Sequence, residues 1–208
     1  MLAHELIEQG LNQLDIGFQP EQIDTLLNFV QMLQKWNKKF NLTAVSETEA
    51  IIHKHLFDSL AVLPYIRGKT VLDIGSGAGF PGIPLAIFLP KINFSLLDSN
   101  GKKTRFLTQA FIQLGLKNVN VLQSRVEQLD KSEKFDNVIC RAFAPLAKAV
   151  ALSKFHVESK GQLLFMKAQA ITAEIQDLSE TYAVETIELA VPGVAEQRFL
   201  ARVVNFSK

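Results

Sequence analysis

Two carboxylates and a run of glycines have the types and spacing that could bind a nucleoside. Asp73 ends a short apolar run, and Gly75, Gly77 and Gly79 follow it. Glycines in a turn between a strand and a helix let a ligand lie against the backbone amides, although such turns also use glycine for geometry alone. Asp98 ends the next apolar run, where an acid can bind both hydroxyl groups of a ribose. Together these residues predict a site for a ligand that contains adenosine.

The spacing of the glycines indicates which adenosine compound is bound. Enzymes that bind dinucleotides carry the pattern G-x-G-x-x-G, whose amides hold a pyrophosphate. Here Phe80 stands where the third glycine would fall. We therefore expect a ligand that lacks a pyrophosphate and has a compact, positively charged tail near Asp73. S-adenosyl-L-methionine fits, because its amino group and its sulfonium favour a nearby carboxylate.

The composition suits one α/β domain with a modest extension. The chain has 208 residues, of which 48% are hydrophobic, and its net charge is only +1. Any contact with nucleic acid would therefore depend on a local basic patch. Cys140 is the only cysteine, which excludes an intramolecular disulfide and a cysteine-based zinc site. The first ten residues do not resemble a signal peptide and no apolar run could span a bilayer, so we expect a cytoplasmic protein without membrane contact.

Helices are predicted for residues 1–65, which we interpret as an N-terminal helical extension packed on the core. Pro20 is expected to begin the second helix. Residues 46–49, Ser-Glu-Thr-Glu, have the form of a capping box and predict a third helix that runs towards Leu63. His53 and His55 point to different faces of that helix, so they do not form a metal-binding pair, and no metal is expected.

Strand and helix patterns alternate in residues 66–208. Strands are predicted at 71–74, 92–97, 119–122, 136–140, 162–167, 182–189 and 199–206, with a helix at 102–114. Such alternation predicts a parallel sheet with helices on both faces. The last two strands, joined through Pro192-Gly193, should form an antiparallel hairpin. Seven strands that end in a hairpin are typical of the Rossmann-like class I methyltransferase fold, so residues 66–208 are predicted to form an S-adenosylmethionine-binding methyltransferase domain.

Six motifs occur in the order seen in one bacterial family. They are WNKKFNLT at 36–43, HLFDS at 55–59, DIGSGAGFPGIP at 73–84, LDS at 97–99, QSRVE at 123–127 and RAFA at 141–144. The chain resembles the RsmG (GidB) family, the bacterial 16S rRNA guanine-N7 methyltransferases, over nearly its whole length. The glycine loop is shared by most methyltransferases, whereas the combination of the first motif with the last two is specific.

The resemblance implies the cofactor, the substrate and the site. S-adenosyl-L-methionine would be the donor, with S-adenosyl-L-homocysteine as product, and a guanine in the 530-loop region of 16S rRNA, alone or in the small ribosomal subunit, the acceptor. By position, the cofactor site would include Gly75, Phe80, Asp98, Val126, Glu127 and Arg141, to which the argument from the residues adds Asp73 and Gly77. Arg125, Arg141, Lys167 and Arg198 fall at the family's basic positions around the cleft. We expect a monomer.

The chemistry of N7 sets the role of these basic residues. N7 of guanine carries a free lone pair, so no general base is needed, and catalysis rests on in-line alignment with the sulfonium methyl group. The positive charge moves to the guanine ring, so a guanidinium on N7 would oppose the reaction. We therefore expect Arg125 and Arg141 to hold phosphate or O6 and, with Lys167, to position the substrate. Cys140 is interpreted as a small core residue.

The target base must leave its helix, because the major groove of A-form RNA is too narrow for protein side chains. Phe80 and Phe143 are candidates for stacking on that base, and either could equally be a core residue. Electrostatic docking is assigned to the cations of the N-terminal half and the cleft, which are Lys35, Lys38, Lys39, Lys54, Lys102, Lys103, Arg105 and Arg198. A solvated basic helix end is the alternative for the first three.

Three other functions remain open from the residues alone. An NAD-dependent dehydrogenase would use a similar fold, although the missing third glycine speaks against it. An RNA-binding or assembly module could hold the cofactor without catalysis. A methyltransferase acting on a small molecule or a protein would use the N-terminal helices as a lid over a closed pocket.

Overall fold

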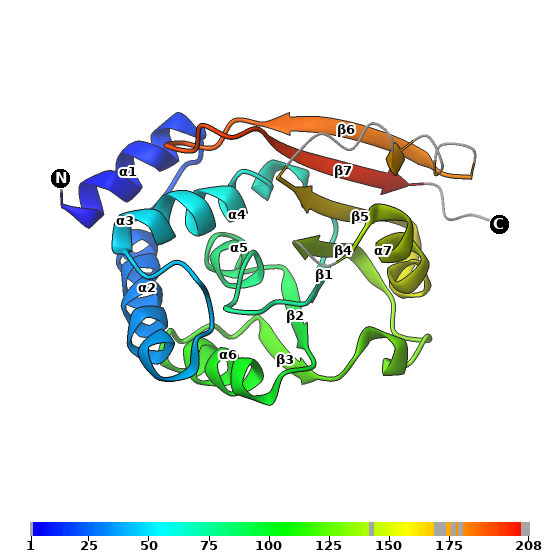
Figure 1. Ribbon diagram of the computed structural model, residues 1–208, viewed down its shortest axis with the longest axis horizontal. Coiled ribbons are helices and arrows are strands. Elements are labelled where there is room, and N and C mark those ends of the chain that lie inside the picture. The colour runs from blue at the N-terminus through cyan, green and yellow to red at the C-terminus, as the bar shows by residue number, and fades with distance from the viewer. Residues whose placement is uncertain (1, 142–143, 169–173, 176–177, 179–180, 205–208) are drawn as a thin grey trace.

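The chain folds around one seven-stranded sheet with the strand order β3-β2-β1-β4-β5-β7-β6 (Figure 1). The computed structural model describes residues 2–141, 144–168, 174–175, 178 and 181–204. The strands are β1 (Thr70–Ile74), β2 (Asn93–Asp98), β3 (Val119–Gln123), β4 (Phe135–Arg141), β5 (Val157–Lys167), β6 (Ala183–Leu189) and β7 (Arg198–Val204). The pairs among β1 to β5 are parallel, whereas β7 runs antiparallel to both β5 and β6. The predicted mostly parallel sheet with a C-terminal hairpin is confirmed.

Strand ends differ most from the prediction where polar residues occupy the strand. β5 begins at Val157, five positions before the predicted start at Gln162. Its first residues after Val157, Glu158-Ser159-Lys160, are exposed and carry no apolar pattern. They lie where the register between β4 and β5 shifts, between the pairs Phe135–Val157 and Asn137–Gln162. The last two residues of the predicted strand 199–206 lie outside the described residues.

Helices cover both faces of the sheet. The helical elements are α1 (Ala3–Gln13), α2 (Pro20–Phe40), α3 (Thr48–Ile51), a π-helical segment (Ile52–Phe57), α4 (Asp58–Leu60), α5 (Gly82–Phe88), α6 (Gly101–Gln113) and α7 (Leu146–Ser153), with short 3-10 turns at Leu63–Tyr65, Val126–Gln128 and Lys154–His156. Val71 of β1 packs in a core with the N-terminal helices, α5 and α6, whereas Leu72 packs with α7 on the other face. Successive residues of a strand point to opposite faces, so β1 contributes to both cores.

The predicted capping box at Ser46 is wrong. The third helix begins at Thr48, its N-cap is Glu47, and no side chain caps its first turn. Gln34 of α2 donates its side-chain amide to the carbonyl of Ser46 and to Oγ1 of Thr48, at 2.9 and 3.0 Å. Docking on α2, rather than a local cap, therefore determines where this helix begins. The helix also stops at Leu60, before the predicted end near Leu63.

The N-terminal helices share one hydrophobic core with the sheet and the helices of residues 66–208. The ring of Phe29 in α2 lies 5.2 Å from that of Phe80 and 6.2 Å from that of Phe106 in α6. Trp36, also in α2, lies 5.6 Å from Phe106. Because these rings are buried together, we expect residues 1–65 and 66–208 to unfold as a single unit.

Replacing Phe29 by Ala should destabilise the whole chain by about 3–5 kcal/mol. It removes a fully buried ring of α2 that packs on Phe80 and on Phe106 of α6. Urea unfolding should be followed both by the fluorescence of Trp36, the only tryptophan, and by far-ultraviolet circular dichroism. We expect coincident transitions in the wild type. Phe40→Ala is the matched control, since this ring of α2 is 37% exposed and its loss should cost far less. Separate transitions for the two probes would show that the N-terminal helices are an independent unit.

Candidate active site

The bend after β1 is fastened to the end of β2. Gly75 and Gly77 have φ angles of 73° and 58°, in the region that favours glycine. The amides of Gly75 and Ser76 donate to the carbonyl of Leu97 at 2.8 and 3.1 Å. The amide of Gly77 donates to Oδ2 of Asp98 at 2.9 Å. The expectation that these amides are free for a ligand is therefore wrong: here they hold the bend against β2, and the glycines offer room for close approach instead.

Gly82, at the start of α5, is a position that the sequence argument did not single out. A Cβ at this residue would lie 2.7 Å from Oδ2 of Asp73 and would also collide with Leu96. Its amide donates to the same carboxylate oxygen at 3.0 Å. The lack of a side chain thus lets the first turn of α5 approach the ends of β1 and β2.

Asp73 is fully buried beneath the bend, with one carboxylate oxygen unused. Oδ2 accepts the hydrogen bond from Gly82, whereas Oδ1 has no hydrogen-bond partner among the described residues. Burial raises the pKa of Asp73 to about 7, and the hydrogen bond from the Gly82 amide opposes this rise. A buried carboxylate with an unsatisfied oxygen is suited to a cationic group, which would lower that pKa.

A cavity of about 330 Å³ lies at the carboxyl ends of the central strands. We call it the cofactor cleft. Seven of the predicted residues line it, namely Gly75, Asp98, Lys103, Arg125, Val126, Glu127 and Arg141. Asp73, Gly77 and Phe80 are not among its lining residues. Asp98 is nearly buried, and its Oδ1 accepts from the amide of Asn100 at 2.8 Å.

Lys103, one of the cations assigned to RNA docking, lines the cofactor cleft. Its ammonium lies 3.8 Å from Oδ2 of Asp98. Lys102 and Arg105, on the same helix, are exposed, and Arg105 donates from Nε to the carbonyl of Gly101 at 3.0 Å. Neighbouring cations in the sequence thus face different surroundings, because α6 turns by about 100° per residue.

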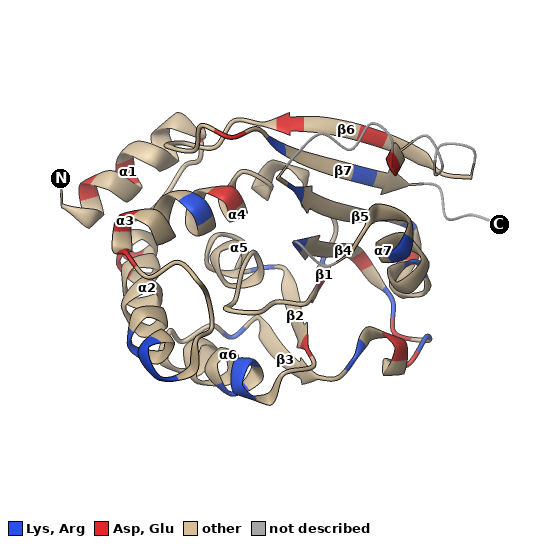
Figure 2. Cartoon of the chain, in the orientation of Figure 1, with Lys and Arg blue, Asp and Glu red and all other residues tan. Residues whose placement is uncertain are grey.

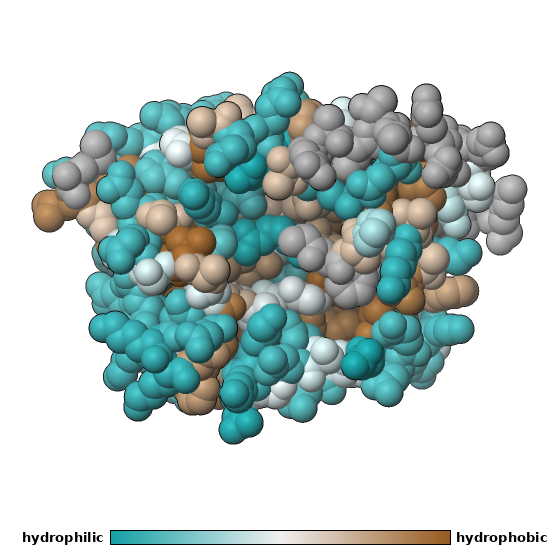
Figure 3. All heavy atoms as spheres, in the orientation of Figure 1, coloured by the Kyte–Doolittle hydropathy of each residue, from teal (hydrophilic) through white to brown (hydrophobic). Residues whose placement is uncertain are grey.

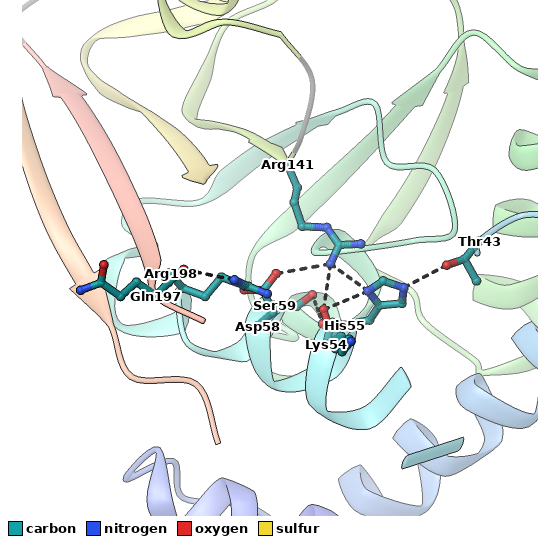
Figure 4. A network of polar contacts seen from close by, with 8 residues as sticks. All are labelled: Thr43, Lys54, His55, Asp58, Ser59, Arg141, Gln197 and Arg198. Carbon is teal, nitrogen blue, oxygen red and sulfur yellow. Dashed lines mark hydrogen bonds and ion pairs between the residues drawn. The ribbon is translucent and has the colours of Figure 1, made fainter. Parts of the chain in front are cut away.

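A second set of polar residues surrounds Arg141 at the end of β4 (Figure 4). One guanidinium nitrogen of Arg141 lies 3.4 Å from Oδ2 of Asp58 and 3.2 Å from Nδ1 of His55. Nε of Arg198, at the start of β7, lies 3.5 Å from Oδ1 of Asp58. Nε2 of His55 lies 3.0 Å from Oγ1 of Thr43. Asp58 therefore joins two arginines that come from distant parts of the chain.

The buried groups of this network have shifted pKa values. Burial lowers the pKa of His55 to about 4, and the neighbouring Arg141 adds to this, so the imidazole is neutral. Burial raises the pKa of Asp58 above its ordinary value, and Arg141 and Arg198 oppose the rise. From the sequence, His55 is expected to be structural or a surface RNA contact, and Asp58 enters only as part of the motif at 55–59. Nothing along the chain indicates that they meet Arg141.

A second cavity, of about 400 Å³, lies on the other side of Arg141. We call it the outer cavity. Its polar lining consists of Lys54, His55, Asp58, Arg141, Lys167 and Arg198. The basic residues predicted around one cleft are therefore divided. Arg125 lines the cofactor cleft, Lys167 and Arg198 line the outer cavity, and Arg141 lines both.

Phe80 is a core residue in this structure. Its side chain is 2% exposed, packed 5.2 Å from Phe29 and 4.9 Å from the ring of His55. The guanidinium of Arg141 lies 5.3 Å from the centre of the same ring. Of the two interpretations, core and stacking platform, the structure supports the core. Phe143, the other candidate, lies outside the described residues.

The remaining predicted cations form an outer basic surface. Lys35, Lys38 and Lys39 are exposed near the C-terminal end of α2, close to α6 with Lys102 and Arg105 (Figure 2). Hydrophilic side chains gather over this part of the molecule (Figure 3).

His53 contacts the carbonyl of Pro192 through Nδ1 at 2.8 Å. Within the described ranges, no group of acidic, histidine or cysteine side chains could hold a metal ion, and no helix could cross a membrane.

The fold is that of the Rossmann-like methyltransferases. The chain is similar to magnesium protoporphyrin IX methyltransferase from Synechocystis PCC 6803, solved with bound S-adenosylmethionine, with a TM-score of 0.61, 17% identity and coverage of 85% of this chain and 97% of the other. It is also similar to precorrin-6y C5,15-methyltransferase from Geobacter metallireducens, with a TM-score of 0.55, 16% identity and coverage of 79% and 91%. At such low identity the likeness concerns the fold.

The sequence identifies the family within this class. Residues 22–201 match the family model of rRNA small subunit methyltransferase G. The chain is 44% identical to ribosomal RNA small subunit methyltransferase G of Legionella pneumophila over 204 residues, 98% of this chain and 95% of the relative. The relative of the same name from Nitrosococcus oceani is 42% identical over 203 residues, 97% and 95% of the two chains. The chain belongs to the rRNA small subunit methyltransferase G (GidB) family.

Asp73 and His55 should tilt the pH dependence of stability in opposite directions. Asp73 holds its proton in the fold up to about pH 7, so its contribution to the free energy of unfolding falls as pH rises from about 4 to 7. His55 loses its proton near pH 4 in the fold, so its contribution rises with pH between about 4 and 6.5.

Urea unfolding of the ligand-free protein at pH 5 and pH 7 measures both effects. The measured quantity is the free energy of unfolding of the variant minus that of the wild type. This difference should be larger at pH 7 than at pH 5 for Asp73→Asn, and smaller at pH 7 than at pH 5 for His55→Gln. Parallel shifts of both variants, independent of pH, would contradict the assigned protonation states.

Proposed function

We propose that this protein transfers the methyl group of S-adenosyl-L-methionine to N7 of a guanine in the 530-loop region of 16S rRNA. The proposal rests on one observation: the cofactor cleft, which contains Asp98, shares Arg141 with the outer cavity, whose polar lining is mainly cationic. A methyl donor in one cavity and a methyl acceptor in the other would therefore meet at Arg141. Family membership supports ribosomal RNA of the small subunit as the acceptor. We expect the protein to act as a monomer in the cytoplasm.

The residues of the cofactor cleft fit S-adenosylmethionine. Asp98 would bind the ribose, and Val126 and Glu127 would lie beside the adenine. Asp73 is not part of the cleft lining, but its carboxylate, buried beneath the bend with an unused Oδ1, would attract the positively charged methionine end. Gly75 and Gly77 would let the ligand approach the bend. When bound, this cofactor supplies an electrophilic methyl group, and S-adenosyl-L-homocysteine is left after transfer.

The protein groups near Arg141 position the substrate rather than move protons. N7 already has a free lone pair, so the reaction needs alignment and not deprotonation. His55 and Asp58 are engaged with Arg141, and burial raises the pKa of the Cys140 thiol well above its ordinary value, so that thiol is no nucleophile. Arg125, Arg141 and Lys167 would hold phosphate or O6 and leave N7 open to the methyl group.

The decisive test uses small ribosomal subunits from cells that lack this enzyme. Incubation with the protein and S-adenosylmethionine labelled on its methyl group should place one label in 16S rRNA. Cleavage specific for 7-methylguanosine should map it to the 530 loop. Cofactor binding is measured separately, by the rise in melting temperature with S-adenosylmethionine or with NAD. Label on another atom or another RNA would overturn the proposal, and stabilisation by NAD alone would favour a dehydrogenase.

The outer basic surface should carry much of the salt dependence of RNA binding. Binding of 16S rRNA should weaken steeply with salt, and replacing Lys35, Lys38 and Lys39 by Ala should lower the slope of log K against log salt by about 2 to 3. The matched control replaces Lys69, Lys117 and Lys160, which are exposed near the opposite ends of β1, β3 and β5. Equal slopes for the two triple variants would show that α2 does not face the RNA.

A further inference from the structure

The outer cavity is lined by segments that precede the first strand in the sequence and by segments that follow β4. Lys54, His55 and Asp58 come from the N-terminal helices, Lys167 from the end of β5, and Arg198 from the start of β7. At about 400 Å³ it has room for a nucleobase and part of its sugar. It adjoins the cofactor cleft through Arg141, so a group placed in it lies next to the donor.

The walls of the outer cavity combine apolar surface with hydrogen-bond donors. Val45, Met166, Leu189 and Phe199 line it beside the polar residues. Apolar side chains suit the flat faces of a purine, as in other ligand pockets. The polar residues are mostly donors, since lysine and arginine carry no acceptor.

The one acid in this lining has no free oxygen to offer. Oδ1 of Asp58 contacts Arg198 and Oδ2 contacts Arg141, at 3.5 and 3.4 Å. Asp58 is 6% exposed, so its charge is compensated by the arginines rather than by water. It holds both guanidinium groups in place. Nη1 of Arg141 also contacts Nδ1 of His55, and Nη1 of Arg198 donates to the carbonyl of Gln197. The guanidinium donors not used in these contacts remain for a ligand.

We propose that the outer cavity is the pocket for the acceptor guanosine, and that Asp58 is the positioning residue that sets Arg141 and Arg198 to receive it. The proposal rests on the function proposed above. Guanine presents the acceptor O6, which can bind a donor while N7 stays open, whereas adenine presents an amino group at that position. A lining rich in donors therefore favours guanine, because the adenine amino group would face other donors.

The contact to the base is tested by steady-state kinetics with small subunits as substrate. Arg198→Ala should raise KM for the subunit about tenfold, the size expected for loss of one specific base contact. The dissociation constant of S-adenosylmethionine should change less than twofold. Arg202→Ala is the matched control: it lies on the same strand, is similarly buried, and pairs with Glu185 and Gln162 away from the cavity. Equal KM values for the two variants would overturn the pocket.

The positioning role of Asp58 needs a readout that separates it from folding. Asp58→Asn keeps the shape but removes the charge between the arginines, so it should raise KM for the subunit and lower kcat. Asp58→Glu should restore part of kcat if the charge positions Arg141. Circular dichroism checks that both variants fold. No change in KM or kcat for folded Asp58→Asn would contradict the positioning role.

Preference for the base is tested with mononucleotides and protein saturated with S-adenosyl-L-homocysteine. Guanosine 5′-monophosphate should bind at least about fivefold more tightly than adenosine 5′-monophosphate, and Arg198→Ala should remove the difference. Equal binding of both would show a site for phosphate alone, and no binding of either would also overturn the proposal. A protein that transfers no methyl group at all fails the proposed function instead, and the mononucleotide titration still reports on the cavity.

Discussion

The buried contact between Asp58 and two arginines connects the three parts of the molecule. Asp58 begins α4 in the N-terminal helices, Arg141 ends β4 in the parallel half of the sheet, and Arg198 begins β7 in the antiparallel hairpin. Removing an ion from water costs several kcal/mol, and this cost is offset only where the partners are close and well placed. The three segments must therefore meet closely for the carboxylate to be buried at all. The same meeting places the cofactor cleft and the outer cavity side by side.

The charge balance of this cluster determines what the site can attract. Asp58 compensates one arginine, Glu174 lies 3.4 Å from the ammonium of Lys167, and the imidazole of His55 is neutral. Lys54 and one guanidinium therefore leave an excess of positive charge in the lining. Phosphate and carbonyl oxygen are favoured there. For the proposed reaction, this charge would favour the acceptor guanine over its methylated product, which carries a positive charge.

The glycine bend contributes space and attachment rather than hydrogen-bond donors. The amides of Gly75 and Gly77 donate to the carbonyl of Leu97 and to the carboxylate of Asp98, which fixes Asp98 relative to the bend. A pyrophosphate would need such amides free. An adenosine compound with a short cationic tail does not, and it would find the unused oxygen of Asp73 below the bend. The engaged amides thus give a second argument for the proposed ligand class, beside the missing third glycine.

The order of apolar runs determined the seven strands, the parallel sheet and the final hairpin, because a period of two and short connections are local properties of the chain. The same local pattern placed Asp98 next to Gly77, since parallel strands bring their carboxyl ends to one edge. Tertiary structure alone decided that Ser46 docks on α2 instead of capping a helix, and that Lys103 and Lys102 face different surroundings. It also decided that Asp58 meets Arg141 and Arg198, which are 83 and 140 positions away in the sequence. Contacts over such distances depend on how helices and strands pack, and no pattern along the chain records that packing.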